Sequence, residues 1–160
     1  MTLNIRRVVT GHDPQGKAIV AIDEVAAHRY EGRPGAVVCN VWTTDESPAN
    51  NSRDEDAGKR DGRFTMLPNG TVFRIIEFKP GVTPRMHRTD SIDYLIVMSG
   101  EIDMALDDGV EVHLQQGDVM VQRGTVHNWI NRGADSCVVA VILVHAHPVQ
   151  AGGKVLHAQG

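Results

Sequence analysis

The sequence predicts an all-β fold, either a sandwich or a barrel. Apolar and β-branched residues occur in short runs, several of them alternating with period two, and turns that contain glycine separate the runs. Ile102, Met104 and Leu106, for example, share one face of their run. The predicted strands, in chain order, are 6–10, 17–23, 36–43, 71–79, 93–98, 101–106, 110–114, 118–122, 126–131 and 137–145.

The segments between these runs support the same prediction. Asp107-Asp108-Gly109 separates the alternating runs 101–106 and 110–114 and is typical of a hairpin turn. Gln116-Gly117 and Arg132-Gly133 mark later connections. Only residues 23–28 have a helical pattern, and it is short.

Length and composition indicate one domain, spanning residues 1–160. A chain of 160 residues is close to the commonest domain size. The net charge of -4 gives no reason to expect nucleic acid as a partner, and no apolar run approaches the length of a membrane span. The N-terminus lacks a secretory pattern. Cys39 and Cys137 are therefore interpreted as thiols of a cytoplasmic protein rather than as a disulfide.

Residues 44–69 differ in kind from the rest of the chain. They are rich in acidic and basic residues, proline and glycine, and they are poor in apolar residues. A segment of this length is too long for a simple turn, and such segments are either disordered, exposed excursions or functional lids. Both interpretations, an excursion and a lid over a barrel mouth, remain open.

Two stretches carry spaced glycine, histidine and acidic residues. In the first, Gly81, His87, Thr89, Asp93 and Gly100 follow the spacing G-x5-H-x-H-x3-E-x6-G, with Thr in place of the second His and Asp in place of Glu. In the second, Gly117, Gly124, His127 and Asn131 follow G-x5-P-x-G-x2-H-x3-N, with the first interval one residue short and Gln122 in place of Pro.

These two motifs resemble those of the cupin family, in its small single-domain, cupin 2 form, with a degenerate first motif. The resemblance implies a jelly-roll barrel, also called a double-stranded β-helix. It does not by itself give a reaction, because one fold can support many chemistries.

His87, Asp93 and His127 are the candidate metal ligands. Positions 87, 89 and 93 fall on one face of an extended segment, and His127 approaches from a later strand. Two imidazoles and a carboxylate suit a divalent metal such as Fe, Mn, Ni or Zn with positions left open for substrate. The alternative is an empty site, in which His87 and His127 are polar pocket residues or a catalytic acid and base.

Four further residues are candidates for lining the pocket. Thr89 would offer a hydroxyl to the ligands or the substrate, and Trp129 shares parity with His127 and would form an apolar wall. Arg74 would hold a substrate carboxylate if it points inward, although burial statistics favour an exposed or ion-paired arginine. His145, at a strand end, is the last candidate.

Three hypotheses for function follow. The first is a metal-dependent cupin enzyme, an oxidoreductase, lyase or isomerase, acting on a small organic molecule by dioxygenation, decarboxylation, dehydration or isomerisation. The second is a non-catalytic module that binds a small ligand at a degenerate metal site. The third is metal-free acid–base catalysis. The resemblance also implies a homodimer, because pairing would cover exposed sheet edges.

Overall fold

The computed structural model describes residues 3–60 and 64–160, and its regular structure is almost entirely strand. No helix in those residues has the length and apolar character needed to cross a membrane. The elements are β1 (Arg6–His12), β2 (Ala18–Val25), β3 (Arg29–Arg33), β4 (Ala36–Thr44), the 3-10 helix η1 (Ala57–Lys59), β5 (Thr71–Phe78), β6 (Ser91–Ser99), β7 (Glu101–Ala105), the 3-10 helix η2 (Asp107–Gly109), β8 (Glu111–Gln115), β9 (Val119–Arg123), β10 (Asn128–Ile130), β11 (Cys137–His145), β12 (Val149–Ala151) and β13 (Lys154–Leu156).

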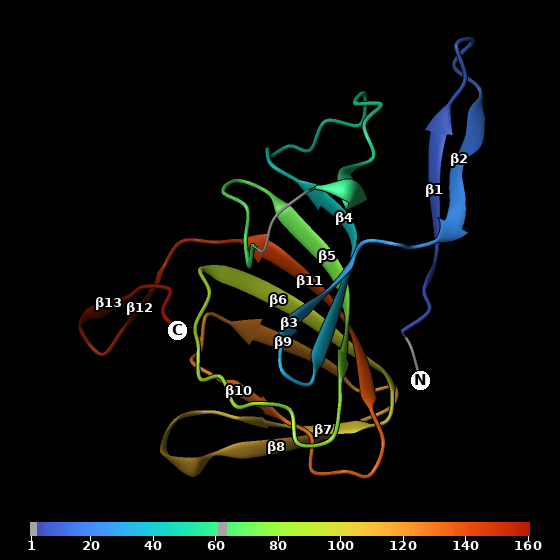
Figure 1. Cartoon of the computed structure of the whole chain (residues 1–160). Helices are drawn as coiled ribbons and strands as arrows, with labels where there is room; N and C mark the ends of the chain where they lie inside the picture. The colour runs from blue at the N-terminus through green and yellow to red at the C-terminus, as the bar shows by residue number, and fades with distance from the viewer. Residues whose placement is uncertain (1–2, 61–63) are drawn as a thin grey trace.

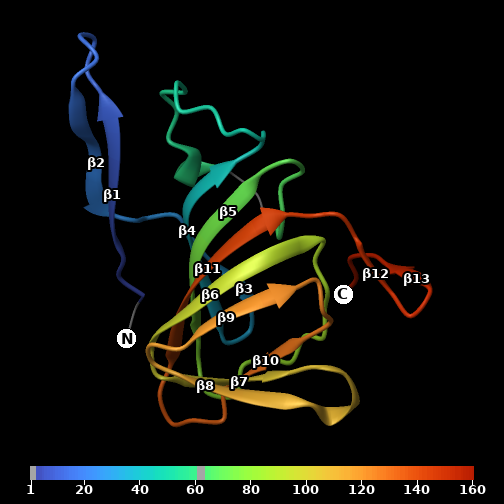
Figure 2. The ribbon, with the colours of Figure 1, turned by 180° about the vertical axis from the view of Figure 1, so that it is seen from behind.

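Two antiparallel sheets enclose the core. The larger has the strand order β3-β4-β5-β11-β6-β9, and the smaller has the order β10-β7-β8. The smaller sheet lies across one end of the larger one (Figures 1 and 2). Apolar side chains from both sheets meet between them, including Val72, Leu95, Val97, Val139 and Leu143 from the larger sheet and Ile102, Met104, Leu114 and Trp129 from the smaller. The chain is therefore a jelly-roll, as the sequence predicts.

Strict alternation in and before β6 carries polar side chains into the interior. Every odd-numbered residue from 87 to 97 is buried, whereas the even-numbered ones are half-buried or exposed. Successive side chains of an extended segment point to opposite faces. The inward face therefore delivers His87 and Asp93 to the same interior as Leu95 and Val97.

All ten predicted strands are present, and so is the hairpin between β7 and β8. Asp108 and Gly109 in its turn have φ angles of 54° and 75°, the left-handed values that Asp and Gly tolerate best. Gly100, between β6 and β7, has a φ of 76°, and a Cβ there would lie 2.7 Å from the Ser136 carbonyl oxygen. Cys39 and Cys137 are free and buried, which confirms that they are thiols.

The helix predicted at residues 23–28 is wrong. Residues 23–25 end β2 and pair with β1 in register from Arg6 to Val8, so strand pairing overrides the weak local helical pattern. Three strands were not predicted: β3, β12 and β13. They are short, and β3 has the sequence Arg-Tyr-Glu-Gly-Arg, which shows no apolar alternation.

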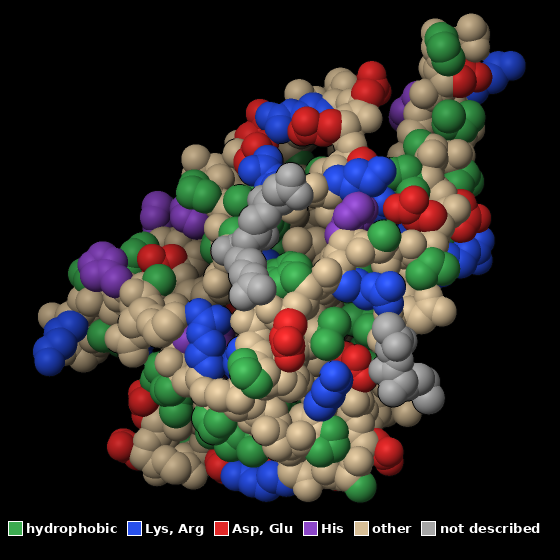
Figure 3. All heavy atoms as spheres, in the orientation of Figure 1, with side chains coloured by type: hydrophobic (Ala, Val, Ile, Leu, Met, Phe, Trp, Pro, Cys, Tyr) green, Lys and Arg blue, Asp and Glu red, His purple; other side chains and the backbone are tan. Residues whose placement is uncertain are grey.

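The hairpin of β1 and β2 forms a separate two-stranded sheet and projects away from the barrel (Figures 1 and 2). It exposes Val8, Ile19, Val20 and Val25, and Figure 3 shows hydrophobic side chains interspersed with charged ones along it. Such a projecting apolar strand pair suits contact with another chain. The homodimer stays a prediction.

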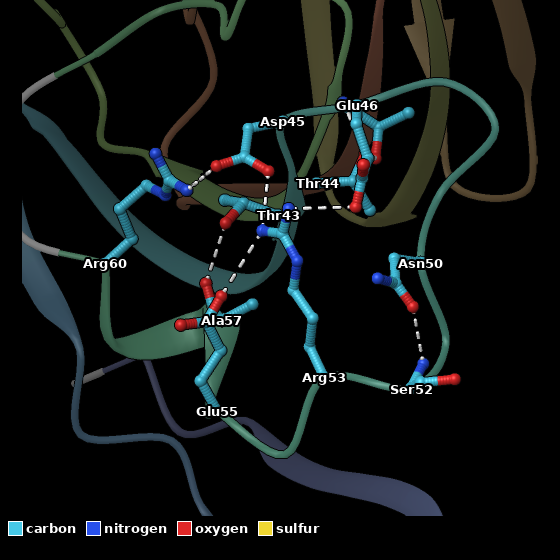
Figure 4. Close-up of polar contacts among 11 residues, drawn as sticks. Thr43, Thr44, Asp45, Glu46, Asn50, Ser52, Arg53, Glu55, Ala57 and Arg60 are labelled. Carbon is cyan, nitrogen blue, oxygen red and sulfur yellow. Dashed lines mark hydrogen bonds and ion pairs between the residues drawn. The ribbon is translucent and has the colours of Figure 1, made fainter.

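Residues 44–69 consist of two parts. Arg53 donates to Asp45 and Glu46 at 2.8 Å, and Arg60 also donates to Asp45, so ion pairs close the first part into a compact surface excursion (Figure 4). The last part differs, because Phe64, Met66 and Leu67 pack against the core. Residues 61–63 lie outside the described residues.

Candidate functional site

A cavity of about 360 Å³ opens inside the barrel. A volume of this size accommodates a small organic molecule. Strands of both sheets supply its walls, together with residues 64 and 65, which lie near the end of the charged segment formed by residues 44–69. The polar and aromatic lining residues are Tyr30, Arg33, Phe64, Thr65, Arg74, Phe78, Arg85, His87, Asp93, Gln122, His127 and Trp129.

His87 and His127 lie side by side in the cavity wall. Their backbones exchange two hydrogen bonds, N–H of each to the carbonyl oxygen of the other, at 2.9 Å. The imidazole centroids are 4.2 Å apart and the rings are tilted by 48°. Trp129 packs edge-on against His127 at 5.8 Å between centroids. The backbone bridge thus brings together two imidazoles that are 40 residues apart in sequence.

Each imidazole is held through the same ring nitrogen. Nδ1 of His87 lies 3.0 Å from the Arg85 carbonyl oxygen, and Nδ1 of His127 lies 3.1 Å from the Thr125 carbonyl oxygen. Because a carbonyl only accepts, Nδ1 of His87 carries the proton and its Nε2 carries the lone pair. Metal-binding histidines commonly use this arrangement, in which Nδ1–H donates to a backbone carbonyl and fixes the ring. At His127, the side-chain amide nitrogen of Gln122, a donor, also lies against Nδ1, so this ring nitrogen meets one acceptor and one donor.

Both imidazoles are neutral at pH 7. Burial lowers the pKa of His127 to about 3, and the neighbouring His87 adds to this effect. Burial likewise lowers the pKa of His87. A neutral imidazole is the form that binds a metal, and it does so without first releasing a proton.

Asp93 is buried near the histidines, but it is tied to its own strand. Ser91 Oγ donates to Asp93 Oδ1 at 2.5 Å and is hydrogen-bonded to Thr89 Oγ1 at 2.8 Å. Burial raises the pKa of Asp93 to about 6, while Ser91 and Arg74 act in the opposite direction. The three candidate ligands His87, Asp93 and His127 do not form a group whose ligand atoms all lie within 4.8 Å of one another. The two imidazoles fit a metal site, whereas Asp93 as oriented does not complete it.

Comparison with known proteins identifies the family. A family model described as a cupin domain matches residues 74–145. The chain is 31% identical over 154 residues to the cupin-domain-containing oxidoreductase fogC of Aspergillus ruber, a match that covers 92% of this chain and 76% of that protein. It is 36% identical over 159 residues to phomopsin biosynthesis cluster protein D of Diaporthe leptostromiformis, with 94% and 83% covered. The chain belongs to the cupin family.

A solved structure supports the cupin fold. A Salmonella typhimurium protein whose name assigns it to ethanolamine utilization, protein Q, superposes with a TM-score of 0.52 over 91% of this chain and 99% of that one. The two sequences are 11% identical, so the likeness concerns the fold alone. The cupin motif residues Gly81, Gly100, Gly117 and Gly124 all adopt positive φ, as turns between strands of this barrel require.

A second group of metal-binding residue types lies outside the cupin cavity. The ligand atoms of Glu24, His28 and Asp56 lie within 4.8 Å of one another. Arg7, however, donates to both oxygens of Asp56 at 2.7 Å and also to Glu24. Its guanidinium already pairs with both carboxylates, and Lys59 lies 3.6 Å from Asp56, so a divalent cation placed there would meet their positive charges.

Of the four other predicted pocket residues, two line the cavity and two do not. Trp129 and Arg74 line the cavity, and Arg74 is buried rather than exposed or ion-paired, because its Nη2 donates to the Phe64 carbonyl oxygen at 2.9 Å. Thr89 is buried but does not line the cavity, since its hydroxyl is engaged with Ser91. His145 is exposed and lines a separate hollow beside Thr44 and Glu46. It therefore lies outside the site.

Sequence reasoning missed several cavity residues. Arg33 and Tyr30 lie in β3, which shows no apolar alternation, and Phe64 lies in the charged segment. Gln122 could have been found, because it occupies the proline position of the second cupin motif, five residues before His127. A polar amide in place of the usual proline, close in sequence to a candidate metal ligand, marks Gln122 as a candidate cavity residue.

Proposed function

We propose that this cupin is a metal-dependent oxidoreductase that acts on a small organic molecule bound in the barrel cavity. The observation that carries the proposal is the pair of adjacent neutral imidazoles, each with its Nδ1 within hydrogen-bonding distance of a backbone carbonyl oxygen. The relatives named as cupin-domain-containing oxidoreductases support the type of reaction.

The residues of the cavity would have different roles in this function. His87 and His127 would hold a divalent ion such as Fe, Mn, Ni or Zn through Nε2, and Asp93 would become a third ligand by turning away from Ser91. Such an ion, when bound, supplies Lewis acidity and, for Fe or Mn, one-electron redox chemistry. Trp129 and Phe78, whose rings are stacked with centroids 6.0 Å apart, provide an apolar wall that excludes water from the bound molecule.

A second candidate function is a non-catalytic module that binds a small ligand without metal. The separation of the three candidate ligands favours it, because no imidazole, thiol or carboxylate of residues 3–60 and 64–160 completes a three-ligand group with both imidazoles in this arrangement. The cavity and its apolar wall would serve such a module equally well.

Metal content separates the two functions. We expect the full-length protein, purified without added metal, to contain about one equivalent of a transition metal per chain by elemental analysis. Loss of that metal on dialysis against a chelator, and recovery on reconstitution, would support the first function. Less than about a tenth of an equivalent, with no gain on reconstitution, would contradict the proposal and favour the metal-free module.

A further inference from the structure

Among the described residues, three arginines line the cavity and face a single carboxylate. Arg33, Arg74 and Arg85 come from β3, β5 and the segment before His87, and Asp93 is the only acidic residue that residues 3–60 and 64–160 contribute to the lining. Among residues 3–60 and 64–160, no ion pair within 4.0 Å involves any of the three. Within the part of the chain that the structure describes, the cavity therefore carries more positively than negatively charged side chains.

Arg33 has the clearest unmatched hydrogen-bond donors. Its Nε and Nη2 atoms are buried and have no hydrogen-bond partner among the described residues. These two nitrogens form one edge of the planar guanidinium, the edge that grips a carboxylate with two parallel bonds. The side chain as a whole is half-buried, and its guanidinium lies 5.8 Å from the centroid of the Phe78 ring. It is therefore partly supported by an aromatic face rather than by an anion.

Arg74 and Arg85 add to the same charge. Arg74 is only 7% exposed; its Nη2 bonds to the Phe64 carbonyl oxygen, and its Nε is buried without a partner. Arg85 donates to the Gly160 carbonyl oxygen at 2.7 Å. Burial lowers the pKa of Arg33, and repulsion from Arg85 lowers it further, as expected for neighbouring like charges without a counter-ion. Buried donors left without an acceptor cost free energy, which an anionic ligand would recover.

We propose that the molecule bound in this cavity is a small organic acid, with its carboxylate held by the Nε–Nη2 edge of Arg33 and its apolar part against Phe78 and Trp129. Arg74 supplies a second donor through Nε, and Arg85 supplies long-range attraction. The inference rests on the proposed function, because it names the substrate class of the same cavity.

Benzoate and benzamide are matched probes for this inference, since they differ in charge and hardly in shape. We expect benzoate to shift the Nε–H resonance of Arg33 saturably in NMR titrations of the full-length protein, and to bind about tenfold more tightly than benzamide. Arg33→Gln should weaken the binding of benzoate about tenfold and leave the binding of benzamide unchanged. Arg33→Lys should give an intermediate benzoate affinity, because lysine keeps the positive charge but lacks the two parallel N–H donors of arginine.

Arg6→Gln is the control, because it removes the same charge from an exposed site on the projecting hairpin. It should change benzoate affinity less than about twofold. Equal affinity for the two probes, no saturable shift with benzoate, or an unchanged affinity in folded Arg33→Gln would overturn the inference.

Chelation separates this inference from the proposed function. Benzoate binding that survives chelation but depends on Arg33 supports the arginine site, even if the protein proves to contain no metal. Benzoate binding that disappears on chelation and is insensitive to Arg33 overturns the inference and leaves the metal proposal intact.

Discussion

His127→Ala is expected to lower bound metal from about one equivalent per chain to below about a tenth. The substitution removes one of the two adjacent neutral imidazoles of the cavity, and a single remaining histidine cannot retain a transition ion against dialysis. The backbone bridge to His87 uses main-chain atoms and survives the substitution. Elemental analysis of folded wild-type and variant protein, purified in parallel, measures the effect.

Two other histidines serve as controls for that variant. His145→Ala removes an exposed imidazole that lines a separate hollow, and His28→Ala removes the imidazole of the group whose two carboxylates pair with Arg7. Both variants should keep the metal content of the wild type. Full occupancy in His127→Ala, or loss of metal in His28→Ala alone, would place the ion away from the cavity.

Arg7→Met is expected to lower the free energy of unfolding by about 2 to 3 kcal/mol. The Arg7 side chain in β1 is 1% exposed, and it pairs with Glu24 in β2 of the same hairpin and with Asp56 beside η1. It also donates to the Val41 carbonyl oxygen in β4, so it ties the projecting hairpin to the charged segment and to the barrel. Methionine fills similar volume but leaves the two carboxylates with only the exposed Lys59 ammonium, 3.6 Å from Asp56, as a nearby cation. Both carboxylates keep some contact with solvent, which holds the loss below that of a fully buried pair.

The neighbouring residue provides a matched control for Arg7. Arg6→Met breaks an ion pair with Asp23 in which the side chains are 71% and 47% exposed, and it should lower the free energy of unfolding far less than Arg7→Met does. Chemical denaturation of the two variants compares them directly. Equal losses would show that Arg7 contributes no more than a surface charge.

The cost of Arg7→Met should also depend on pH. The hydrogen bonds from Arg7 hold the pKa of Asp56 below its usual range. The unfolded chain therefore takes up a proton at Asp56 before the folded chain does, and this contribution to stability is present above about pH 4 and is lost as the pH falls through the folded pKa. The difference between wild type and variant should shrink in acid.

Local patterns in the sequence were sufficient to predict most of the strands of the fold. The alternation of Ile102, Met104 and Leu106, with the Asp107-Asp108-Gly109 turn, predicts a hairpin because both signals are local. β3 could not be predicted in this way, because it is short and owes its extended form to pairing with β4. The helix predicted at residues 23–28 failed for the same reason, since pairing with β1 decides the backbone there.

Some residues of the candidate site could also be predicted from the sequence, and others could not. Motif spacing was enough to predict that His87 and His127 lie in one cavity, because strand geometry and the backbone bridge between them fix both positions. Spacing could not reveal that the Asp93 carboxylate bonds to Ser91, because that depends on a side-chain rotamer. It could not reveal Arg33 either, because nothing local marks an arginine of an irregular edge strand as facing a cavity.

A crystal structure of the purified protein, with anomalous diffraction recorded at the absorption edge of the metal found by elemental analysis, tests the central claim most directly. We predict an anomalous peak inside the barrel, about 2.0 to 2.2 Å from Nε2 of both His87 and His127. A peak among Glu24, His28 and Asp56 instead, or none in a protein that carries a full equivalent of metal, would contradict the account.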